Sequence, residues 1–206
     1  MKLIVVPFLA LLLFGLVGCK NTLIEEAVPE SPKNISVFQQ SMLDEINLAR
    51  TNPALYAEQR LKSDKGNSTD NGSYDYLVNL TPVGSISFCN CLNESAINYA
   101  QYLSEKNVMG HNEDGTPLKR AMSEGFVGTS VGENIAAASG DSFNSTIDPK
   151  SAAVGFVRIM IIDAGVDDLG HRLTILNSKY KTVGIGFSHN SASTYVNYNV
   201  QDFGNL

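Results

Sequence analysis

Apolar residues change their spacing along this chain, and the change narrows the choice of fold class. Through most of the sequence they recur every three or four positions, which is the period of an amphipathic helix. Helices are predicted at 37–52, 53–61, 91–107, 117–123, 149–163 and 171–178. The polar stretch 62–75, which contains two glycine turn signals, is predicted to be a loop.

The last part of the chain has the composition of β-strands. Residues 181–188 and 194–203 are rich in β-branched and aromatic side chains, and the turn residues between them predict a hairpin. The segment "VGENIAAAS", residues 131–139, is a third predicted strand. Helices bury their apolar faces best by covering both faces of such a small sheet. We therefore predict an α+β fold, a three-layer α–β–α sandwich around a small, mainly antiparallel sheet.

The N-terminus indicates the compartment. Lys2 precedes an apolar run from Leu3 to Val17. This run is short for a stable membrane span, and no charged stop-transfer sequence follows it immediately. The ending "LVGC" resembles a bacterial lipobox, and the resemblance implies cleavage before Cys19 and acylation of its thiol. We expect residues 1–18 to be a lipoprotein signal peptide and Cys19 to carry the lipid.

The rest of the chain divides into a tether and one domain. Residues 19–35 are polar and acidic and contain two prolines, which predicts a flexible tether. Residues 36–206 suit a single domain with one core. The net charge is −6 and the basic residues are scattered, so the sequence has no nucleic-acid footprint.

Glu133 is a single carboxylate inside the otherwise apolar segment 131–139. Burying such a charge is costly unless a partner balances it. The chain has three histidines, and His111 and His171 each follow a glycine, which leaves room beside the ring. His189 lies in the predicted hairpin turn, where we expect a solvated side chain.

The motifs "GHNEDG", "VGENIAAAS" and "GHRLTIL" together resemble the CAP superfamily, in its bacterial secreted, SCP-like branch. The resemblance begins near "MLDEINLARTNP" and runs to the C-terminus. It implies an α–β–α sandwich in which two histidines and usually two acids converge in a central cleft that holds a divalent metal in some members. His111, Glu133 and His171 match these positions, and two imidazoles with one carboxylate suit zinc or another divalent metal.

The chain departs from the family pattern at the second acid. Eukaryotic members place a glutamate and a tryptophan on the helix before the second histidine, but "GFVRIMIIDAGVDDLGHR" contains neither. Asp163, at the end of the apolar helix, is the best substitute. We expect Asp167 and Asp168 to lie in an exposed loop.

Three functional hypotheses stay open. The first is a lipid-anchored binding module for a lipid, a sterol-like molecule or a cell-wall fragment. The second is a metal-dependent hydrolase in which zinc activates water and Glu133 or Asp163 takes the proton. The third is a structural or interaction protein in which the three residues only stabilise the fold. Because no activated nucleophile is recognisable, we favour the binding module over an enzyme.

Cys19 also sets the expected location, a bacterial cell envelope with the membrane as partner through the lipid anchor. Lys20 lacks the acidity associated with inner-membrane retention in enterobacteria, and Glu25-Glu26 resembles export signals of some diderms, so we expect the outer membrane or cell surface.

Cys89 and Cys91 form a C-x-C pair with no second pair to complete a metal site. Buried thiols and a local disulfide both remain open.

Overall fold

The computed structural model describes residues 34–205, so the predicted signal peptide, Cys19 and most of the predicted tether lie outside the described residues. The helices are α1 (Val37–Thr51), α2 (Pro53–Tyr56), α3 (Ser73–Val78), α4 (Asn90–Lys106), α5 (Pro117–Ser123), α6 (Pro149–Ile162) and α7 (Gly170–Ile175), with a π-helical turn η1 (Ala57–Leu61) and a 3-10 turn η2 (Asp141–Phe143). The strands are β1 (Ser87–Phe88), β2 (Val131–Ala138), β3 (Thr182–His189) and β4 (Asn197–Gly204).

The strands form one sheet in the order β1-β3-β4-β2. β4 pairs antiparallel with both β3 and β2, and the short β1 pairs parallel with β3. Glu133 on β2 pairs with Asp202 on β4, and Asp202 also pairs with Gly184 on β3. The predicted hairpin and the predicted third strand are therefore confirmed, and β2 lies at an edge of the sheet.

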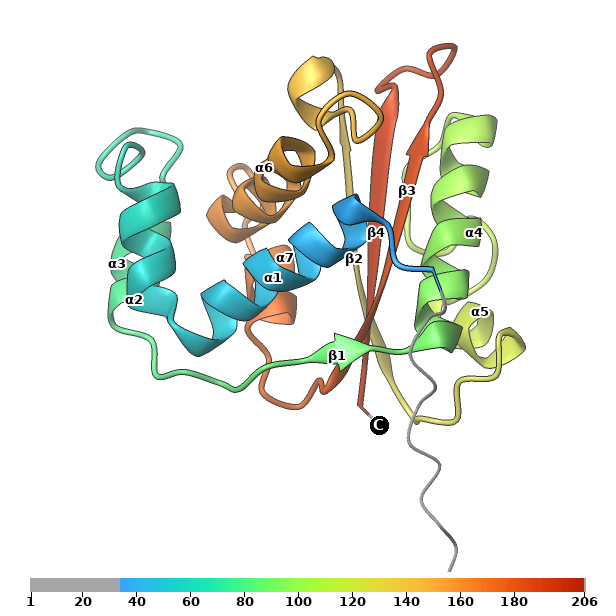
Figure 1. Ribbon diagram of the computed structural model, residues 1–206, viewed down its shortest axis with the longest axis horizontal. Helices are drawn as coiled ribbons and strands as arrows, with labels where there is room; N and C mark the ends of the chain where they lie inside the picture. The colour runs from blue at the N-terminus through green and yellow to red at the C-terminus, as the bar shows by residue number, and fades with distance from the viewer. Residues whose placement is uncertain (1–33, 206) are drawn as a thin grey trace, which may run out of the picture.

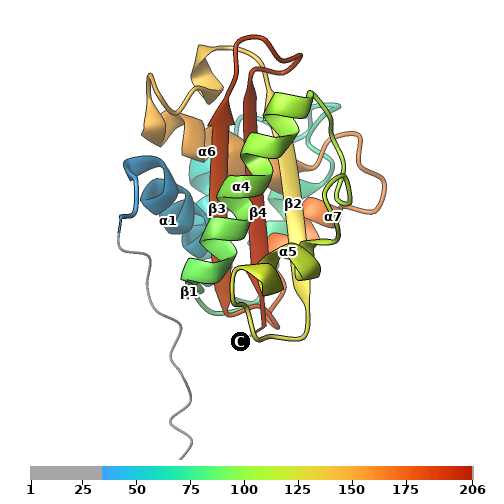
Figure 2. The same cartoon turned by 90° about the vertical axis from the view of Figure 1, so that its right-hand side faces the viewer.

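Helices cover both faces of the sheet, as Figures 1 and 2 show from two directions. One face packs against α1 and α6 in the larger apolar cluster, which includes Phe38, Phe156 and Phe203. The other face packs against α4 and α5 in two smaller clusters. The predicted α+β class and three-layer α–β–α sandwich are confirmed. Alternate residues of β2 face opposite layers, so Ile135 packs with α4 while Ala136 packs with the cluster around α6.

Two glycines of β3 allow helix α4 to pack very close to the sheet. A Cβ atom at Gly184 would lie 2.0 Å from the backbone of Leu92, and one at Gly186 would lie 2.0 Å from the carbonyl oxygen of Ala96. Contacts this short are impossible, so only glycine lets the helix backbone rest on the strand. Figure 2 shows α4 lying across β3 and β4 on this face of the sheet.

Side-chain caps begin two of the predicted helices, α5 and α6. Thr116 caps α5 by accepting a hydrogen bond from the backbone N–H of Lys119 at 3.3 Å. Asp148 caps α6 by accepting one from the backbone N–H of Ser151 at 3.1 Å. In both helices proline occupies the first turn, where its missing N–H costs nothing.

Two short elements differ from the prediction. The predicted loop 62–75 contains the start of α3, which Asp70 supports by accepting a hydrogen bond from the Ser73 hydroxyl at 2.8 Å. β1 is only two residues long. Neither element is long enough to show a periodic pattern, so strand pairing and the contacts of Asp70 support them rather than apolar spacing. At the start of α4, the sulfur atoms of Cys89 and Cys91 form a local disulfide, which decides between the two alternatives left open by the sequence.

Arg50 ties the end of α1 to the loops around it. Its side chain is fully buried and donates hydrogen bonds to backbone carbonyls of Gly84, Ile175, Asn177 and Tyr180, at 2.6 to 3.1 Å. Burial lowers the pKa of Arg50 to about 10, which still leaves the guanidinium charged at neutral pH. The charge is therefore balanced by carbonyl dipoles, and the loops before β1 and β3 are held in place.

Candidate functional site

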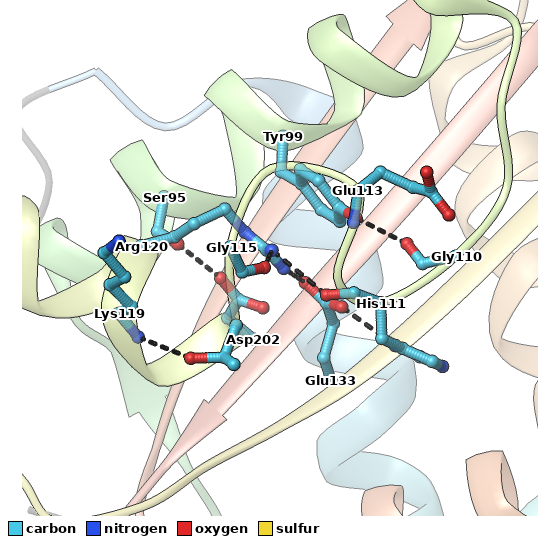
Figure 3. Close-up of polar contacts among 11 residues, drawn as sticks. Ser95, Tyr99, Gly110, His111, Glu113, Gly115, Lys119, Arg120, Glu133 and Asp202 are labelled. Carbon is cyan, nitrogen blue, oxygen red and sulfur yellow. Dashed lines mark hydrogen bonds and ion pairs between the residues drawn. The ribbon is translucent and has the colours of Figure 1, made fainter.

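Glu133 lies on the α4/α5 side of strand β2 with its side chain only 1% exposed. Its Oε1 atom is 2.8 Å from Nδ1 of His111, which comes from the loop between α4 and α5. Its Oε2 atom accepts a hydrogen bond from Nη2 of Arg120 on α5. Figure 3 shows this carboxylate between the imidazole and the guanidinium. The cost of burying the charge is thus offset by one full cation and one imidazole.

Arg120 is the partner that sequence reasoning missed. Its side chain is 9% exposed, and its Nη1 atom also donates to the carbonyls of His111, at 3.1 Å, and Gly115. The guanidinium carbon lies 3.3 Å from the centroid of the Tyr99 ring, a cation–π contact. Arg120 therefore fixes the loop that carries His111 as well as balancing Glu133. No residue spacing signals this, because the two partners belong to different elements.

Asp202 is a second buried acid beside Glu133. Asp202 is completely buried on β4, and its Oδ2 atom accepts a hydrogen bond from the hydroxyl of Ser95 at 2.7 Å (Figure 3). Burial raises the pKa of Asp202 well above its ordinary value, and the charge of Glu133 raises it further. The neutral acid is favoured because two adjacent carboxylates would repel each other. The alternation of Tyr198, Val200 and Asp202 on one strand face was the available signal.

His171 has a separate acid partner. It lies on α7, and its Nδ1 atom is 2.6 Å from Oδ1 of Asp163 at the end of α6. The other oxygen of Asp163 accepts hydrogen bonds from the backbone N–H groups of His171, at 3.0 Å, and Arg172, at 3.2 Å. Asp163, which the sequence offers as the substitute for the family's second acid, is therefore the acid that contacts His171. Asp167 and Asp168 are exposed in the following loop.

The two histidine–acid pairs approach β2 from different sides. Glu133 faces α5 and meets His111, while the next residue, Asn134, faces the other layer and donates its side-chain amide to the carbonyl of His171 at 3.1 Å. The resemblance implies that both histidines converge with Glu133 in one cleft, and the structure differs from this expectation. It pairs Glu133 with His111 and Arg120, and it pairs His171 with Asp163. His189, at the end of β3, bonds to the side chain of Asn197.

The predicted zinc ligands do not gather into a three-ligand set. Within residues 34–205, no group of three or more His, Cys, Asp or Glu side chains is placed to hold a metal ion. Both oxygens of Glu133 are engaged, and each imidazole uses Nδ1 for its own acid. A catalytic zinc site normally has three protein ligands. The arrangement therefore does not fit such a site, and metal binding by His111, His171 and Glu133 stays a prediction.

A cavity of about 350 Å³ lies beside His171, between α6, the loops that follow η1 and α6, and β2. Its apolar wall is formed by Ala136, Ile159, Met160, Ile162, Ala164 and Val166. Its polar side chains are Thr69 and two pairs, Asp163 with His171 and Asp64 with Arg158. His111 does not line this cavity, so only one of the two histidines faces it.

None of the helices in the described range is long and apolar enough to cross a membrane.

Comparison with known proteins identifies the family. Residues 43–203 match the family described as "CAP: Cysteine-rich secretory protein family". Among solved structures, BmVAL-1 is similar with a TM-score of 0.50 and 15% identity, over 86% of this chain and 82% of that one. At this identity the likeness shows the fold alone, an α–β–α sandwich. A search of curated proteins finds no match.

Two bacterial structures have lower TM-scores. An outer surface protein from Borrelia burgdorferi has a TM-score of 0.48 and 17% identity, over 81% of this chain and 91% of that one. An extracellular protein containing an SCP domain from Bacillus anthracis str. Ames has a TM-score of 0.44 and 20% identity, over 71% of this chain. The match spans only 44% of the Bacillus anthracis chain.

Proposed function

This chain belongs to the CAP family, the cysteine-rich secretory proteins, and on that basis we propose that it is an extracytoplasmic binding module whose cavity beside His171 holds a small apolar ligand. The ligand class is a lipid, a sterol-like molecule or an apolar part of a cell-wall molecule. Acylation of Cys19 would anchor the module to the envelope, at the outer membrane or cell surface. The secretory character in the family's description supports a location outside the cytoplasm.

The cavity is the observation that carries this proposal. Its volume of about 350 Å³ falls in the range of small-molecule sites, and such sites combine apolar walls with a few placed polar groups. Each Å² of apolar ligand surface removed from water contributes about 25 cal/mol. The Asp163–His171 pair supplies the orienting group, because Asp163 accepts a hydrogen bond from Nδ1–H of His171 and leaves Nε2 of neutral His171 able to accept one from a ligand.

The test is a calorimetric titration of the purified protein with decanol, below its solubility limit. We expect saturable binding to wild type. The change Ala136→Phe places a large ring in the cavity on a strand that tolerates aromatic residues, and we expect it to weaken binding at least about tenfold. Val127→Phe, at a position 82% exposed, is the matched control and leaves binding unchanged. Equal affinity in wild type and Ala136→Phe would show that the cavity is not the site.

The same Asp163–His171 pair favours hydrolysis as a second candidate. An imidazole oriented by a carboxylate can act as a general base toward water or a ligand hydroxyl. Hydrolysis of p-nitrophenyl esters of short fatty acids tests this, with His171→Gln expected to abolish turnover and His111→Gln to preserve it. Absence of turnover in wild type rules out the ester hydrolase. Absence of both turnover and saturable binding leaves the structural role.

A further inference from the structure

The disulfide at the start of α4 joins two cysteines, Cys89 and Cys91, that are separated by Asn90 alone. A disulfide stabilises a fold mainly by restricting the unfolded chain, and this effect shrinks as the closed loop becomes shorter. A loop with one intervening residue is therefore a poor staple. The bond needs an explanation other than the stability of the domain.

Other contacts hold this segment in place. The backbone N–H of Cys89 donates a hydrogen bond to the carbonyl of Val183 at 3.1 Å, and that of Ser87 donates to the carbonyl of Lys181 at 3.1 Å. Leu92, in the first turn of α4, is fully buried in an apolar cluster that also includes Cys89. These contacts join β1 to β3 and fix the start of the helix, so the disulfide can open while the surrounding fold stays in place.

The two sulfur atoms differ in access. Cys89 is 1% exposed, whereas Cys91 is half-buried at the edge of the same cluster. The rate of thiol–disulfide exchange depends on which sulfur an external thiolate can reach. Access therefore makes Cys91 the residue that is attacked and Cys89 the leaving group.

The start of α4 can accommodate the leaving thiolate. Cys89 is the N-cap residue of this helix, and it makes no side-chain capping hydrogen bond while it is in the disulfide. Within residues 34–205, the backbone N–H groups of Asn90, Cys91 and Leu92 donate to no acceptor. Burial in an apolar cluster opposes a thiolate, but free N–H donors and the positive end of the helix dipole favour one. A stabilised leaving thiolate makes a disulfide easier to open.

We infer that the Cys89–Cys91 bond is a redox-active disulfide that exchanges with a low-molecular-weight thiol, and that Cys91 carries the adduct. This inference is independent of the proposed ligand cavity. The external thiolate attacks Sγ of Cys91, the bond between the two cysteines breaks, and its electron pair leaves with Sγ of Cys89.

Two routes lead on from the mixed disulfide. The Cys89 thiolate can attack Sγ of Cys91, which expels the external thiolate and restores the ring. A second external thiolate can instead attack the external sulfur of the adduct and release Cys91 as a thiolate. In that case the two external thiols are oxidised to a disulfide, and the protein gains two electrons and ends as a dithiol.

The first experiment exposes the wild-type chain to reduced glutathione at a few millimolar near neutral pH. Acid stops the exchange, N-ethylmaleimide blocks free thiols, and the mass of a proteolytic peptide reports the state of the bond. The tryptic peptide 66–106 contains both cysteines and excludes Cys19. We expect most of this peptide to be the glutathione adduct or the dithiol, with the circular dichroism spectrum of the protein unchanged.

A matched pair of variants identifies the attacked residue. Cys89→Ser and Cys91→Ser each keep one thiol at the start of the same helix, so exposure decides their rates. Oxidised glutathione converts each thiol to a mixed disulfide and releases one reduced glutathione. We expect the adduct to form at least about tenfold faster in Cys89→Ser, which retains the more exposed Cys91. Equal rates, or a faster Cys91→Ser, would overturn the assignment of Cys91.

The state of the wild-type bond decides the inference as a whole. A peptide that stays oxidised in the folded protein and reacts only after urea is added would show a permanent structural bond. Loss of the circular dichroism spectrum in step with reduction would show that the fold requires the disulfide. Either result would overturn the redox role and leave the proposed binding module untouched.

Discussion

Glu133 and Asp202 stand opposite each other on neighbouring strands, so that two buried carboxyl groups share one small region of the sheet. One of them is balanced by Arg120, and the other is favoured as the neutral acid. Two acids this close are stable only when one holds a proton or gains a cation. This pair therefore contributes to the way in which the stability of the protein changes with pH.

Asp202→Asn should flatten that response. Because the pKa of Asp202 is raised in the folded protein, its contribution to stability is fully present below the unfolded pKa and is lost as pH rises through the folded value. Removing the group should make the free energy of unfolding fall less steeply with rising pH, by up to about 1.4 kcal/mol per pH unit. Urea unfolding from pH 4 to 8 measures this. Asp167→Asn, at an exposed position, is the control, and identical slopes for wild type and Asp202→Asn would contradict the prediction.

Glu133→Gln should lower stability without affecting the cavity. The change leaves the Arg120 guanidinium buried beside a neutral amide, and breaking such a pair commonly costs about 3–5 kcal/mol. Glu133 faces the layer opposite the cavity, so decanol affinity of the folded variant should stay within about twofold of wild type. Thermal melts and calorimetry together provide the test. A folded variant that no longer binds decanol would connect Glu133 to the ligand site and refute the separation of the two histidine–acid pairs.

The tautomer of His171 is a direct readout of its contact with Asp163. The carboxylate can only accept a hydrogen bond, so neutral His171 should carry its proton on Nδ1. Nitrogen NMR of the imidazole should report this form in wild type and a mixture of tautomers in Asp163→Asn. Asparagine tolerates the left-handed conformation at this position, where φ is 56°, so the fold should survive. His189, which bonds to Asn197, serves as an internal control whose signals should not move.

Alanine at Gly184 or Gly186 should destabilise the whole domain. The new methyl group would overlap the backbone of α4, and forced overpacking costs about 1–3 kcal/mol or more. Denaturant midpoints should fall for both variants. Gly170→Ala is the matched control, since its new Cβ would meet only the flexible side chain of Asp168. Wild-type midpoints for the β3 variants would mean that α4 packs farther from the sheet.

The predicted zinc site has its own test. The sequence predicts one ion per chain, lost in His111→Ala and in His171→Ala. Uptake through Glu133 would cost its ion pair with Arg120, so we expect weaker affinity than that of a preformed three-ligand site. Calorimetry near pH 7.5, where free imidazoles are mostly neutral, measures it. No heat of binding with any variant would end the zinc hypothesis, while loss of binding in both histidine variants would support it.

Much of the fold follows from local sequence. Helices α1, α4 and α6 are long enough for their apolar period to be read directly, and β3 and β4 show the composition of strands. The caps at Thr116 and Asp148 mark the starts of α5 and α6 because capping is a contact within one turn. The elements that local patterns missed, α3 and β1, are too short to carry a period.

The site depends on contacts between distant segments. His111, Glu133, Asp163 and His171 were recognisable as candidates from the motifs around them, but their pairing was not. Arg120 and Asp202 gave no motif, because a buried ion pair and a protonated acid are defined by what packs against them. Apolar spacing and capping are properties of residues that are close in the sequence. The sequence alone was therefore enough to predict the three-layer arrangement. The acid that pairs with each imidazole is determined where β2 packs against helices of both layers. The cavity along α6 also depends on this packing, which the sequence alone does not reveal.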